Sequence, residues 1–364
     1  MALGQQPTSG EVEIEYLFTV GESIEFGEAG YILTPRSLTT DQNGLIYVSE
    51  HQGRQVQQYT ANGEYIRSFG RAGMGPGEFN QLAAIAIDSE NRLMVLDRFQ
   101  FKVSRFDTET GDVEEHRFEE MSQINMMTLV PLADDLFAGI YMETGPNLSN
   151  LVEMRAIRIY RFGEGEKESS VYEIFNHQFD SGIELERSLG TGIGHQLIGL
   201  SDNELVVGHR LYRGKHYIVD RETGNVRTFE NDRLLPPFIH KMDLDDRPTE
   251  GERRFAGSIT SFGSMGNFYY QILKMSLLMG VIDDELYHFY RENEKEGYGF
   301  SDHVEIFSQD GLLLYHGEVN VPNRSKEKPE FRHYLHIDEQ GRLFVLDRYE
   351  MDDPKIRVYQ IRMS

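Results

Sequence analysis

The chain contains no cysteine, so neither a disulfide nor thiol chemistry can take part in its structure or mechanism. It also lacks a long hydrophobic run. The apolar segment 272–282 includes Lys274 and is shorter than the about 18 residues of a membrane span. The first ten residues, MALGQQPTSG, have no apolar core of the kind found in a secretion signal. We expect an extracytoplasmic protein whose signal peptide is absent from this sequence, although a cytoplasmic protein with a loose tail fits equally well.

Basic residues are scarce. Lysine and arginine number 36 against 60 acidic residues, which gives a formal net charge of −24. An excess of negative charge repels polyphosphates and anionic lipid headgroups, so we expect no nucleic-acid partner and no membrane insertion. The Gly-x-Ser-x-Gly motif of many esterases is absent too. No Ser-His-Asp triad can be assigned from the order of the residues, because triads are recognised by geometry.

Glycine, in contrast, is frequent, with 35 residues, many of them in Asn-Gly, Asp-Gly and Gly-Glu steps that mark turns. Helix signals are few, and this composition favours an all-β protein. Between residues 37 and 97 one pattern occurs twice at a constant separation of 47 residues: Asp41, Gly44, Ile46 and Glu50 are matched by Asp88, Asn91, Leu93 and Asp97. A repeat of about 20 to 50 residues that contains several short strands predicts a β-propeller.

The two ends of the chain carry parts of one blade. The run IDEQGRLFVLDRY, residues 337–349, matches IDSENRLMVLDRF, residues 87–99, at a separation of 250 residues. Residues 12–20 alternate like a strand and stand where a repeat would end. We therefore predict that this N-terminal strand completes the C-terminal blade and closes the ring without a free sheet edge. Weaker copies in between bring the number of four-stranded blades to six.

The predicted propeller forms one domain of residues 11–364, preceded by a flexible tail of residues 1–10. Blade three is placed at about 126–175, blade four at 195–230 and blade five at 274–319, and NFYYQILKMSLLMGV is interpreted as the inner strand of blade five with its approach. Segments of about 141–150, 179–194 and 231–268 exceed what a blade needs. We predict that they are insertions, which in repeat folds often border a binding site.

Several motifs carry a family resemblance. An aspartate turn, an apolar strand ending in Val-x-Asp, Asn-Gly-Glu-Tyr and Phe-Gly-x-x-Gly-x-Gly-Pro-Gly-x-Phe together resemble NHL repeats, especially the six-bladed propellers of exported bacterial proteins. The match is specific over residues 37–118 and 331–359 and weak in blades three to five. The resemblance implies a closed propeller that binds ligands at one face of its central channel. Many such proteins are binding modules, whereas some are calcium-dependent lactonases or zinc-dependent lyases, so the fold alone does not settle the function.

Antiparallel pairing brings the start of each inner strand and the end of each second strand to the same face of the disc. Aligning the blades puts many cations there, although the chain is acidic. The predicted ligand-binding residues are Arg36, Arg98, His195, Arg210, Arg291, His333 and Arg348. Converging guanidinium groups bind carboxylate, phosphate or sulfate through paired hydrogen bonds. We predict a binding propeller that holds an anionic small molecule, an acidic saccharide or a protein partner at this channel mouth.

Two alternatives concern the same face. The second strands are predicted to end at Glu50, Asp97, His209, Tyr290 and Asp347. Such acids can form structural ion pairs instead, Asp97 with Lys102 and Asp347 with Lys355. A metal-dependent lactonase, lyase or hydrolase would use some of His195, His333, Glu50, Asp97 and Asp347 with calcium or zinc in the channel. Arg36 stands where the resemblance calls for a third histidine or a glutamate, so we expect no cofactor.

The glycine-rich run GRAGMGPGEF could be mistaken for a phosphate-binding loop. It lacks the Lys-Ser/Thr pair that follows such a loop, and it precedes a strand rather than a helix. We interpret it as a turn between two blades.

Overall fold

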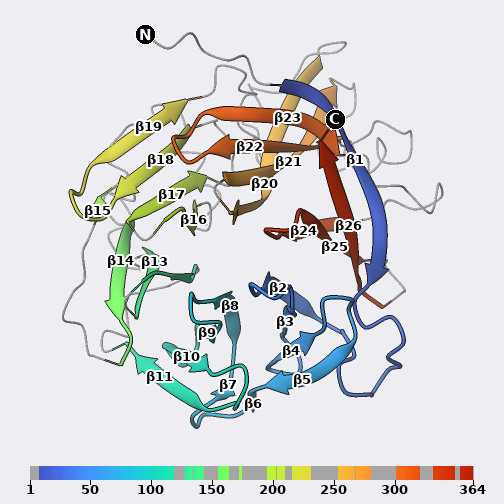
Figure 1. The fold of residues 1–364 in the computed structure, drawn as a ribbon, viewed down its shortest axis with the longest axis vertical. Coiled ribbons are helices and arrows are strands. Elements are labelled where there is room, and N and C mark those ends of the chain that lie inside the picture. Colours follow the sequence, from blue (N-terminus) through green and yellow to red (C-terminus); the bar gives the residue numbers. More distant parts are fainter. Residues whose placement is uncertain are drawn as a thin grey trace.

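The computed structural model describes residues 8–118, 128–133, 135–142, 155–163, 172–173, 195–201, 203–209, 215–230, 253–266, 268–279, 301–319, 331–348 and 353–363. Across these ranges all regular secondary structure is β-strand, and the strands form six blades around a common axis (Figure 1). The chain is a six-bladed β-propeller, as its repeat predicts. Among the same residues, no helix is long and apolar enough to cross a membrane.

Four strands make up each blade, and they follow one another from the axis outwards. Blade 1 contains β2 (Pro35–Thr40), β3 (Ile46–Glu50), β4 (Gln55–Tyr59) and β5 (Tyr65–Phe69). Blade 2 contains β8 (Leu82–Ile87), β9 (Leu93–Asp97), β10 (Lys102–Phe106) and β11 (Val113–Arg117). Blade 3 contains β12 (Val130–Pro131), β13 (Leu136–Met142), β14 (Arg155–Arg161) and β15 (Tyr172–Glu173).

The remaining blades follow the same order. Blade 4 contains β16 (His195–Gly199), β17 (Glu204–His209), β18 (Lys215–Asp220) and β19 (Val226–Glu230). Blade 5 contains β20 (Arg253–Met265), β21 (Phe268–Met279), β22 (Ser301–Ser308) and β23 (Leu313–Val319). Blade 6 contains β24 (Phe331–Ile337), β25 (Arg342–Arg348), β26 (Lys355–Met363) and β1 (Thr8–Thr19). A small parallel pair, β6 (Arg71–Ala72) and β7 (Glu78–Phe79), lies in the connection between blades 1 and 2.

The N-terminal strand β1 closes the ring, which confirms the prediction. It pairs antiparallel with β26 from Val12 opposite Met363 to Thr19 opposite Arg357, and the two strands lie side by side in Figure 1. Its first residues, 8–12, also pair in parallel with residues 315–319 of β23. One strand thereby joins blades 5 and 6 into a continuous sheet. Residues 8–10, predicted to belong to a flexible tail, are instead part of β1.

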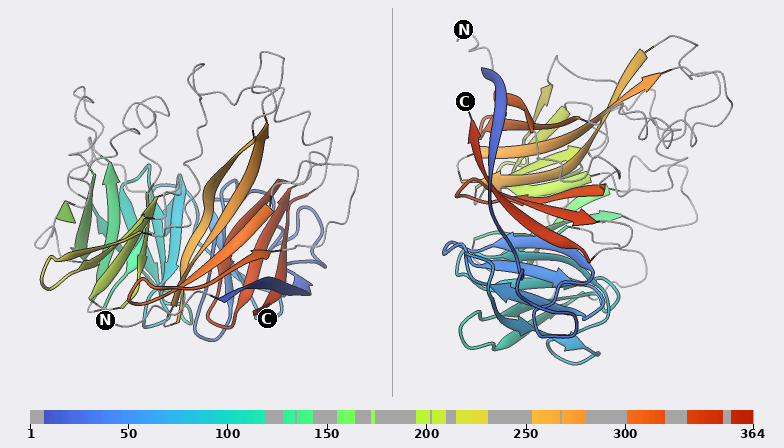
Figure 2. Two further views of the ribbon diagram at one scale, coloured as in Figure 1. Left: turned by 90° about the horizontal axis from the view of Figure 1, so that it is seen from above. Right: turned by 90° about the vertical axis from the view of Figure 1, so that its right-hand side faces the viewer.

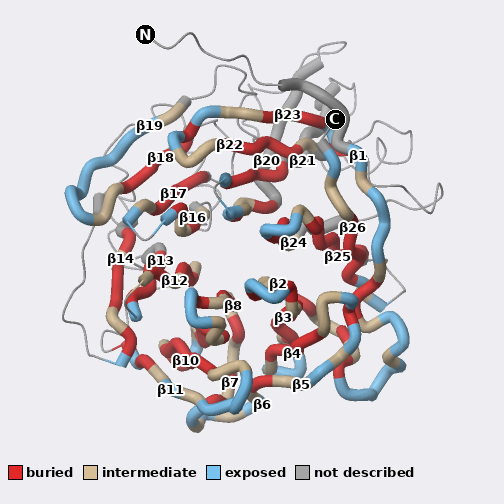
Figure 3. The backbone as a smooth tube through the Cα atoms, viewed as in Figure 1, coloured by how far each residue is buried: buried red, intermediate tan, exposed pale blue. Residues whose placement is uncertain are grey.

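The hydrophobic core is divided into six clusters, one at each interface between neighbouring blades. Successive side chains of a strand point to opposite faces of its sheet. In β17, for example, Leu205 and Val207 pack towards blade 3, whereas Val206 packs towards blade 5. Because both faces are covered, second strands such as β9 (LMVLD) and β25 (RLFVLDR) contain consecutive apolar residues. Figure 3 shows the burial of middle strands such as β3, β4 and β10 and the greater exposure of the outer strands β5, β11 and β19.

The aspartate turns explain why the repeat is so regular. Asp41 Oδ1 accepts hydrogen bonds from the amides of Asn43 at 2.9 Å and Leu45 at 2.8 Å, and Gly44 has a φ of 78°. A left-handed φ favours glycine or asparagine, which accounts for glycine or asparagine at the third position after the aspartate. The turns that begin at Asp88 and Asp338 make the same pair of bonds. Each turn connects an inner strand to its second strand.

Blade 5 departs from the prediction. The run NFYYQILKMSLLMGV supplies β21, the second strand, and the inner strand β20 comes from residues 253–265, which we had assigned to an insertion. Its sequence, RRFAGSITSFGSM, is rich in serine and glycine, residues of low strand propensity. Close packing requires one of the glycines, since a Cβ on Gly263 would lie 2.5 Å from the hydroxyl of Tyr270. The two strands have 13 and 12 residues, and they extend beyond the other blades at one face of the disc (Figure 2).

Candidate functional site

The starts of the inner strands and the ends of the second strands meet at one face of the disc, which we call the mouth face. The strand register confirms this: Pro35 lies opposite Glu50, Leu82 opposite Asp97, and Arg332 opposite Asp347. The strands that flank connections 143–154, 174–194, 231–252, 280–300 and 320–330 all begin or end at this face. The opposite face, which we call the turn face, carries the tight turns 41–45, 88–92 and 338–342.

The predicted ligand-binding residues lie on this framework as follows. Arg36 is the second residue of β2, and Arg98 directly follows β9. His195 begins β16 opposite His209, His333 lies in β24, and Arg348 ends β25 opposite Phe331. Of these residues, only Arg36 and Arg98 have side chains that the structure describes. Arg210 and Arg291 lie outside the described residues.

One alignment at this face is wrong. In blade 5 the second strand was predicted to end at Tyr290, followed by Arg291. The strand β21 instead ends at Met279, opposite Arg253 of β20. The error follows from the misassigned inner strand, because every later position in the blade was counted from it.

The buried acids of the mouth face hold loops in place. The carboxylate of Asp97, which is fully buried, accepts hydrogen bonds from the amides of Asn80 at 2.6 Å, Phe99 at 2.9 Å and Gln100 at 2.9 Å. Glu50, at the equivalent position in blade 1, accepts a bond from the amide of Thr34. Each acid therefore ties the end of its second strand to the segment that enters its own blade from the preceding one. These carboxylates are structural.

The ion pairs that we predicted for these acids are formed by other residues. Lys102 lies opposite Asp97 in the register, but its ammonium group contacts Glu115 and donates to the carbonyl of Gly75 at 2.9 Å. Asp347 pairs with Arg357, its diagonal neighbour, and Lys355 is exposed. Long side chains reach diagonal neighbours across a sheet as easily as direct ones. The predicted pairs, Asp97 with Lys102 and Asp347 with Lys355, are therefore wrong in their partners.

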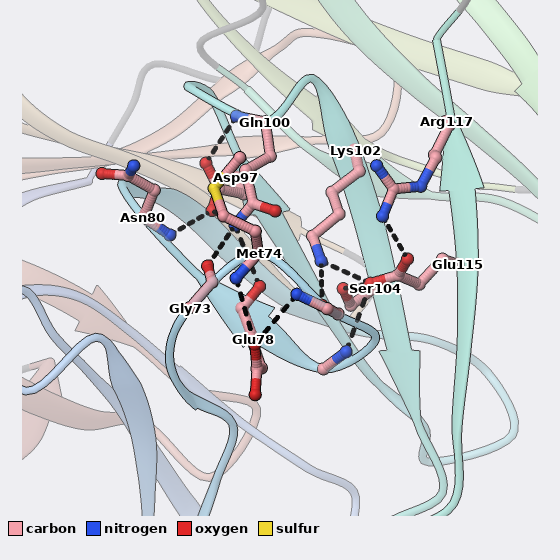
Figure 4. Close-up of polar contacts among 12 residues, drawn as sticks. Gly73, Met74, Glu78, Asn80, Asp97, Gln100, Lys102, Ser104, Glu115 and Arg117 are labelled. Carbon is pink, nitrogen blue, oxygen red and sulfur yellow. Dashed lines mark hydrogen bonds and ion pairs between the residues drawn. The ribbon is translucent and has the colours of Figure 1, made fainter.

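The glycine-rich loop 70–79 is fixed by this network of buried polar groups (Figure 4). The amides of Met74 and Gly75 donate to Glu78 Oε2 at 3.0 and 2.9 Å, and Gln100 Nε2 donates to the carbonyl of Gly73 at 2.9 Å. The hydrogen bond from the backbone amide of Gly75 and the hydrogen bond from the side chain of Arg71 lower the pKa of Glu78. Because the carboxylate already occupies the loop amides, the loop has none of these donors left for a phosphate. It is a turn between blades 1 and 2.

Two arginines at the mouth face have no acidic partner. Arg36 Nη1 lies 3.4 Å from the carbonyl of Leu82, and the amide of Arg98 donates to the carbonyl of Gln81 at 3.0 Å. The two residues thus meet around one dipeptide from adjacent blades. No carboxylate in the described ranges pairs with either guanidinium group. Several arginines elsewhere form ion pairs, namely Arg71, Arg92, Arg105, Arg117, Arg227, Arg342, Arg357 and Arg362, whereas Arg67 donates to Gln58 and to the carbonyl of Glu109.

His51 adds a third group to this region. It occupies the same place in blade 1 as Arg98 in blade 2, and its amide donates to the carbonyl of Thr34 at 3.1 Å. The ring nitrogen Nδ1 is buried and has no hydrogen-bond partner. Buried polar atoms are nearly always satisfied, so a group of this kind marks a place where a ligand or a water molecule can bind. Among the described residues, the mouth face between blades 1 and 2 therefore carries two guanidinium groups without a carboxylate partner and one imidazole nitrogen without a hydrogen bond.

A metal centre has no support in the described side chains. Within the ranges given above, no three or more His, Asp or Glu side chains are grouped so that they could hold a metal ion. Glu50, Asp97 and Asp347 are bonded to backbone amides or to an arginine. The arrangement at the mouth face is suited to binding an anion through hydrogen bonds and charge.

The sequence analysis missed a hollow on the turn face. A pocket of about 270 Å³ lies among the ends of β2, β8, β20 and β24. It is lined by Thr39, Thr40, Asp41, Gln42, Ile87, Asp88, Ser89, Ser264, His336, Asp338, Glu339 and Gln340. The repeated aspartates were a visible signal, but they suggested only turns. The contribution of Ser264 could not be found while β20 was assigned to an insertion.

Comparisons with known proteins agree on the fold. The sequence signature of the DUF5128 family, described as a 6-bladed beta-propeller, matches residues 34–174. A crystal structure of a DUF4221 family member from Bacteroides vulgatus is 14% identical, covers 97% of this chain and 99% of its own, and has a TM-score of 0.56. An identity this low shows the fold alone.

Two enzymes are among the similar structures. A catalytically inactive virginiamycin B lyase from Staphylococcus aureus, solved with quinupristin, is 11% identical over 96% of this chain and 99% of its own, with a TM-score of 0.46. A gluconolactonase from Xanthomonas campestris is 13% identical over 95% of this chain and 94% of its own, with a TM-score of 0.47. Similarity at this level carries no argument about activity.

Proposed function

We propose that this chain is a binding propeller of the NHL type that holds an anionic small molecule or an acidic saccharide at the mouth face. The observation that carries the proposal is the meeting of Arg36 and Arg98 around residues 81–82 without acidic partners. In a chain with a net charge of −24, two arginines that contact adjacent residues of one segment and have no acidic partner among the described residues are unexpected. His195, Arg210, His333 and Arg348 are proposed to extend the site around the ring.

The chemistry favours an oxyanion as the ligand. A guanidinium group presents a planar set of N–H donors that matches carboxylate, phosphate and sulfate oxygens. The mouth-face acids Glu50 and Asp97 do not compete for these donors, because backbone amides occupy them. His51, which follows the second strand of blade 1 as Arg98 follows that of blade 2, has a further polar atom, Nδ1, without a hydrogen-bond partner among the described residues. The exposed side chains of Met74 and Phe99 lie on the neighbouring loops and give such a ligand apolar surface to contact.

Thermal unfolding in the presence of candidate anions tests this proposal. We expect inorganic phosphate, sulfate or a hexuronic acid to raise the Tm of the parent protein, because a ligand that binds only the folded state stabilises it. The double variant Arg36→Ala/Arg98→Ala should keep its fold and lose the response. Arg71→Ala is the matched control, since Arg71 is exposed in the connection between blades 1 and 2 and is already paired with Glu78. A double variant that responds like the parent would refute the site.

Related predictions need separate measurements. Replacing Arg348 with alanine tests whether the anion site reaches blade 6, and an unchanged anion response in this variant would confine the site to blades 1 and 2.

The alternative of a metal-dependent lactonase, lyase or hydrolase predicts a fall in Tm when a chelator removes the metal. The proposed extracytoplasmic location can be tested by fractionating cells that produce the complete gene product.

A further inference from the structure

The segment that enters blade 2, residues 80–82, carries side chains that a simple anion would not use. Asn80 and Gln81 are half-buried, and their backbone amides donate to the carboxylate of Asp97 at 2.6 and 3.3 Å. Neither side-chain amide has a hydrogen-bond partner among the described residues. Figure 4 shows the side-chain amide of Asn80 pointing away from Asp97. The mouth face therefore presents two carboxamide groups, each of which can donate and accept hydrogen bonds.

Phe99 belongs to the same cluster. Its backbone amide donates to Asp97 Oδ1 at 2.9 Å, and the amide of the preceding residue, Arg98, donates to the carbonyl of Gln81 at 3.0 Å. The backbone amides of Asn80, Gln81 and Phe99 thus converge on one buried carboxylate, so the three side chains start from one small area. Phe99 itself is 58% exposed.

The backbone that carries this phenyl ring is held firmly. The side chain of Gln100 is buried, and its Nε2 atom donates to Asp97 Oδ2 at 2.8 Å and to the carbonyl of Gly73 at 2.9 Å. It thereby ties the turn after β9 to the glycine-rich loop, where the exposed Met74 follows Gly73. Side chains that touch a ligand are precise when a second layer of hydrogen bonds supports them. The exposure of Phe99 is therefore a property of a fixed turn.

Three kinds of group on this small area together describe a ligand. Guanidinium groups, here Arg36 and Arg98, bind a carboxylate through paired hydrogen bonds. Carboxamides can donate to one hydroxyl group and accept from the next. The face of an aromatic ring carries partial negative charge, which suits the C–H groups of a sugar ring. Sulfate or phosphate would use only the first of these features, and a neutral sugar only the other two.

We propose that the ligand of the mouth face is a hexuronic acid, free or as part of a saccharide. Its carboxylate lies at Arg36 and Arg98, its hydroxyl groups lie at the carboxamides of residues 80 and 81, and its ring lies against Phe99. This inference rests on the anion site proposed above and narrows its ligand to one chemical class. A few placed polar groups beside an aromatic surface are typical of small-molecule sites.

The first test compares ligands on the parent protein by isothermal titration calorimetry with the complete chain. D-glucuronate and D-galacturonate carry all three features, whereas D-glucose lacks the carboxylate, cyclohexanecarboxylate lacks the hydroxyl groups and sulfate lacks the ring. We expect at least one of the two uronates to bind about tenfold more tightly than each of the three incomplete ligands, since each of these loses one set of contacts. Equal affinities for a uronate and any incomplete ligand would overturn the inference.

The second test uses variants of exposed or half-buried side chains. Phe99→Ala should weaken uronate binding by about tenfold, the effect of losing about 50 Å² of buried apolar surface, and sulfate binding by less than about twofold. Phe268→Ala is the matched control, because Phe268 is an exposed phenylalanine at the start of β21, on the turn face. Asn80→Ala/Gln81→Ala keeps the backbone amides that bind Asp97, and it should lower uronate affinity to that of cyclohexanecarboxylate.

The outcomes separate this inference from the proposed function. Uronate affinity that is unchanged in Phe99→Ala, or reduced equally in Phe268→Ala, would overturn the inference. The anion site would still stand if sulfate binding were lost in Arg36→Ala/Arg98→Ala. Sulfate and uronate binding that both survive in that double variant would refute the anion site, and the inference with it.

Discussion

The two faces of the disc use buried acids differently. On the turn face, Asp88 and Asp338 organise turns within one blade and are balanced by an arginine four residues later. On the mouth face, Asp97 and Glu50 bind backbone amides of the segment that enters the blade, which leaves Arg36 and Arg98 without acidic partners. The charge available to a ligand is therefore set by which groups are already bonded. A count of acidic and basic residues does not reveal it.

The two faces exist only in a closed ring, and we expect the largest effect from deleting β1, which closes it. Removal of residues 1–20 takes away the outer strand of blade 6 and its parallel pairing with β23. We expect aggregation, or a fall in Tm of roughly 10 °C or more, because a long sheet edge becomes exposed. Thermal unfolding and size-exclusion chromatography measure this. Deletion of residues 1–7, which leaves β1 intact, is the control, and equal melting of the two truncated proteins would contradict closure by β1.

Lys102 tests whether the mouth-face network is structural. It is fully buried between Glu115 and the carbonyl of Gly75 (Figure 4). Lys102→Met leaves a mostly buried carboxylate without its main partner, and we expect a loss of about 3 kcal/mol in the free energy of unfolding, measured with urea. Arg71→Met, at an exposed pair, should change it by less than about 0.5 kcal/mol. Equal effects would show that the buried pair has no special role.

His336 gives the turn face a distinct dependence on pH. Its pKa falls from an ordinary value near 6.5 to about 4 in the folded protein, so the unfolded chain binds a proton more readily between these values. Stability is therefore fully present above about pH 6.5 and declines as the pH falls towards 4, by at most about 1.4 kcal/mol per unit from this group. Urea unfolding of the parent and of His336→Gln at pH 7.5, 6 and 5 should give a shallower decline for the variant. Parallel curves would argue against a neutral, buried imidazole.

The smallest change in the free energy of unfolding is expected for the two mouth-face arginines. Arg36→Ala/Arg98→Ala should alter the free energy of unfolding by less than about 0.5 kcal/mol, since neither guanidinium group has an acidic partner in the described structure. A loss above about 1 kcal/mol would mean that the two arginines stabilise the ring, which would weaken the case for a ligand site.

Much of the fold could be predicted because its signals are local. The turn at Asp41 needs an acid, a left-handed residue and two amides within five positions, and the same pattern recurs at Asp88 and Asp338. The inner strand β20 could not be recognised, because its serines and glycines have low strand propensity, and the contact with Tyr270 that requires Gly263 cannot be seen in the sequence. Because β20 was missed, the end of the second strand of blade 5, and with it the position of Arg291, was predicted wrongly.

The sites were less predictable than the fold, for a related reason. Register alone cannot say whether Asp347 binds Lys355 directly across the sheet or Arg357 on the diagonal. The turn-face pocket is assembled from four blades, so no segment of sequence contains it.

The double pairing of β1 has a consequence for biosynthesis. Among the strands of the propeller β1 is made first, whereas its partners β23 and β26 are made after the strands of blades 1 to 4. Until β26 has been made, the nascent propeller carries an unmatched strand and an incomplete set of blades, a state that is prone to association with other chains. Closure of the ring therefore depends on a pairing between segments far apart in the sequence, and such long-range pairings are slow to form.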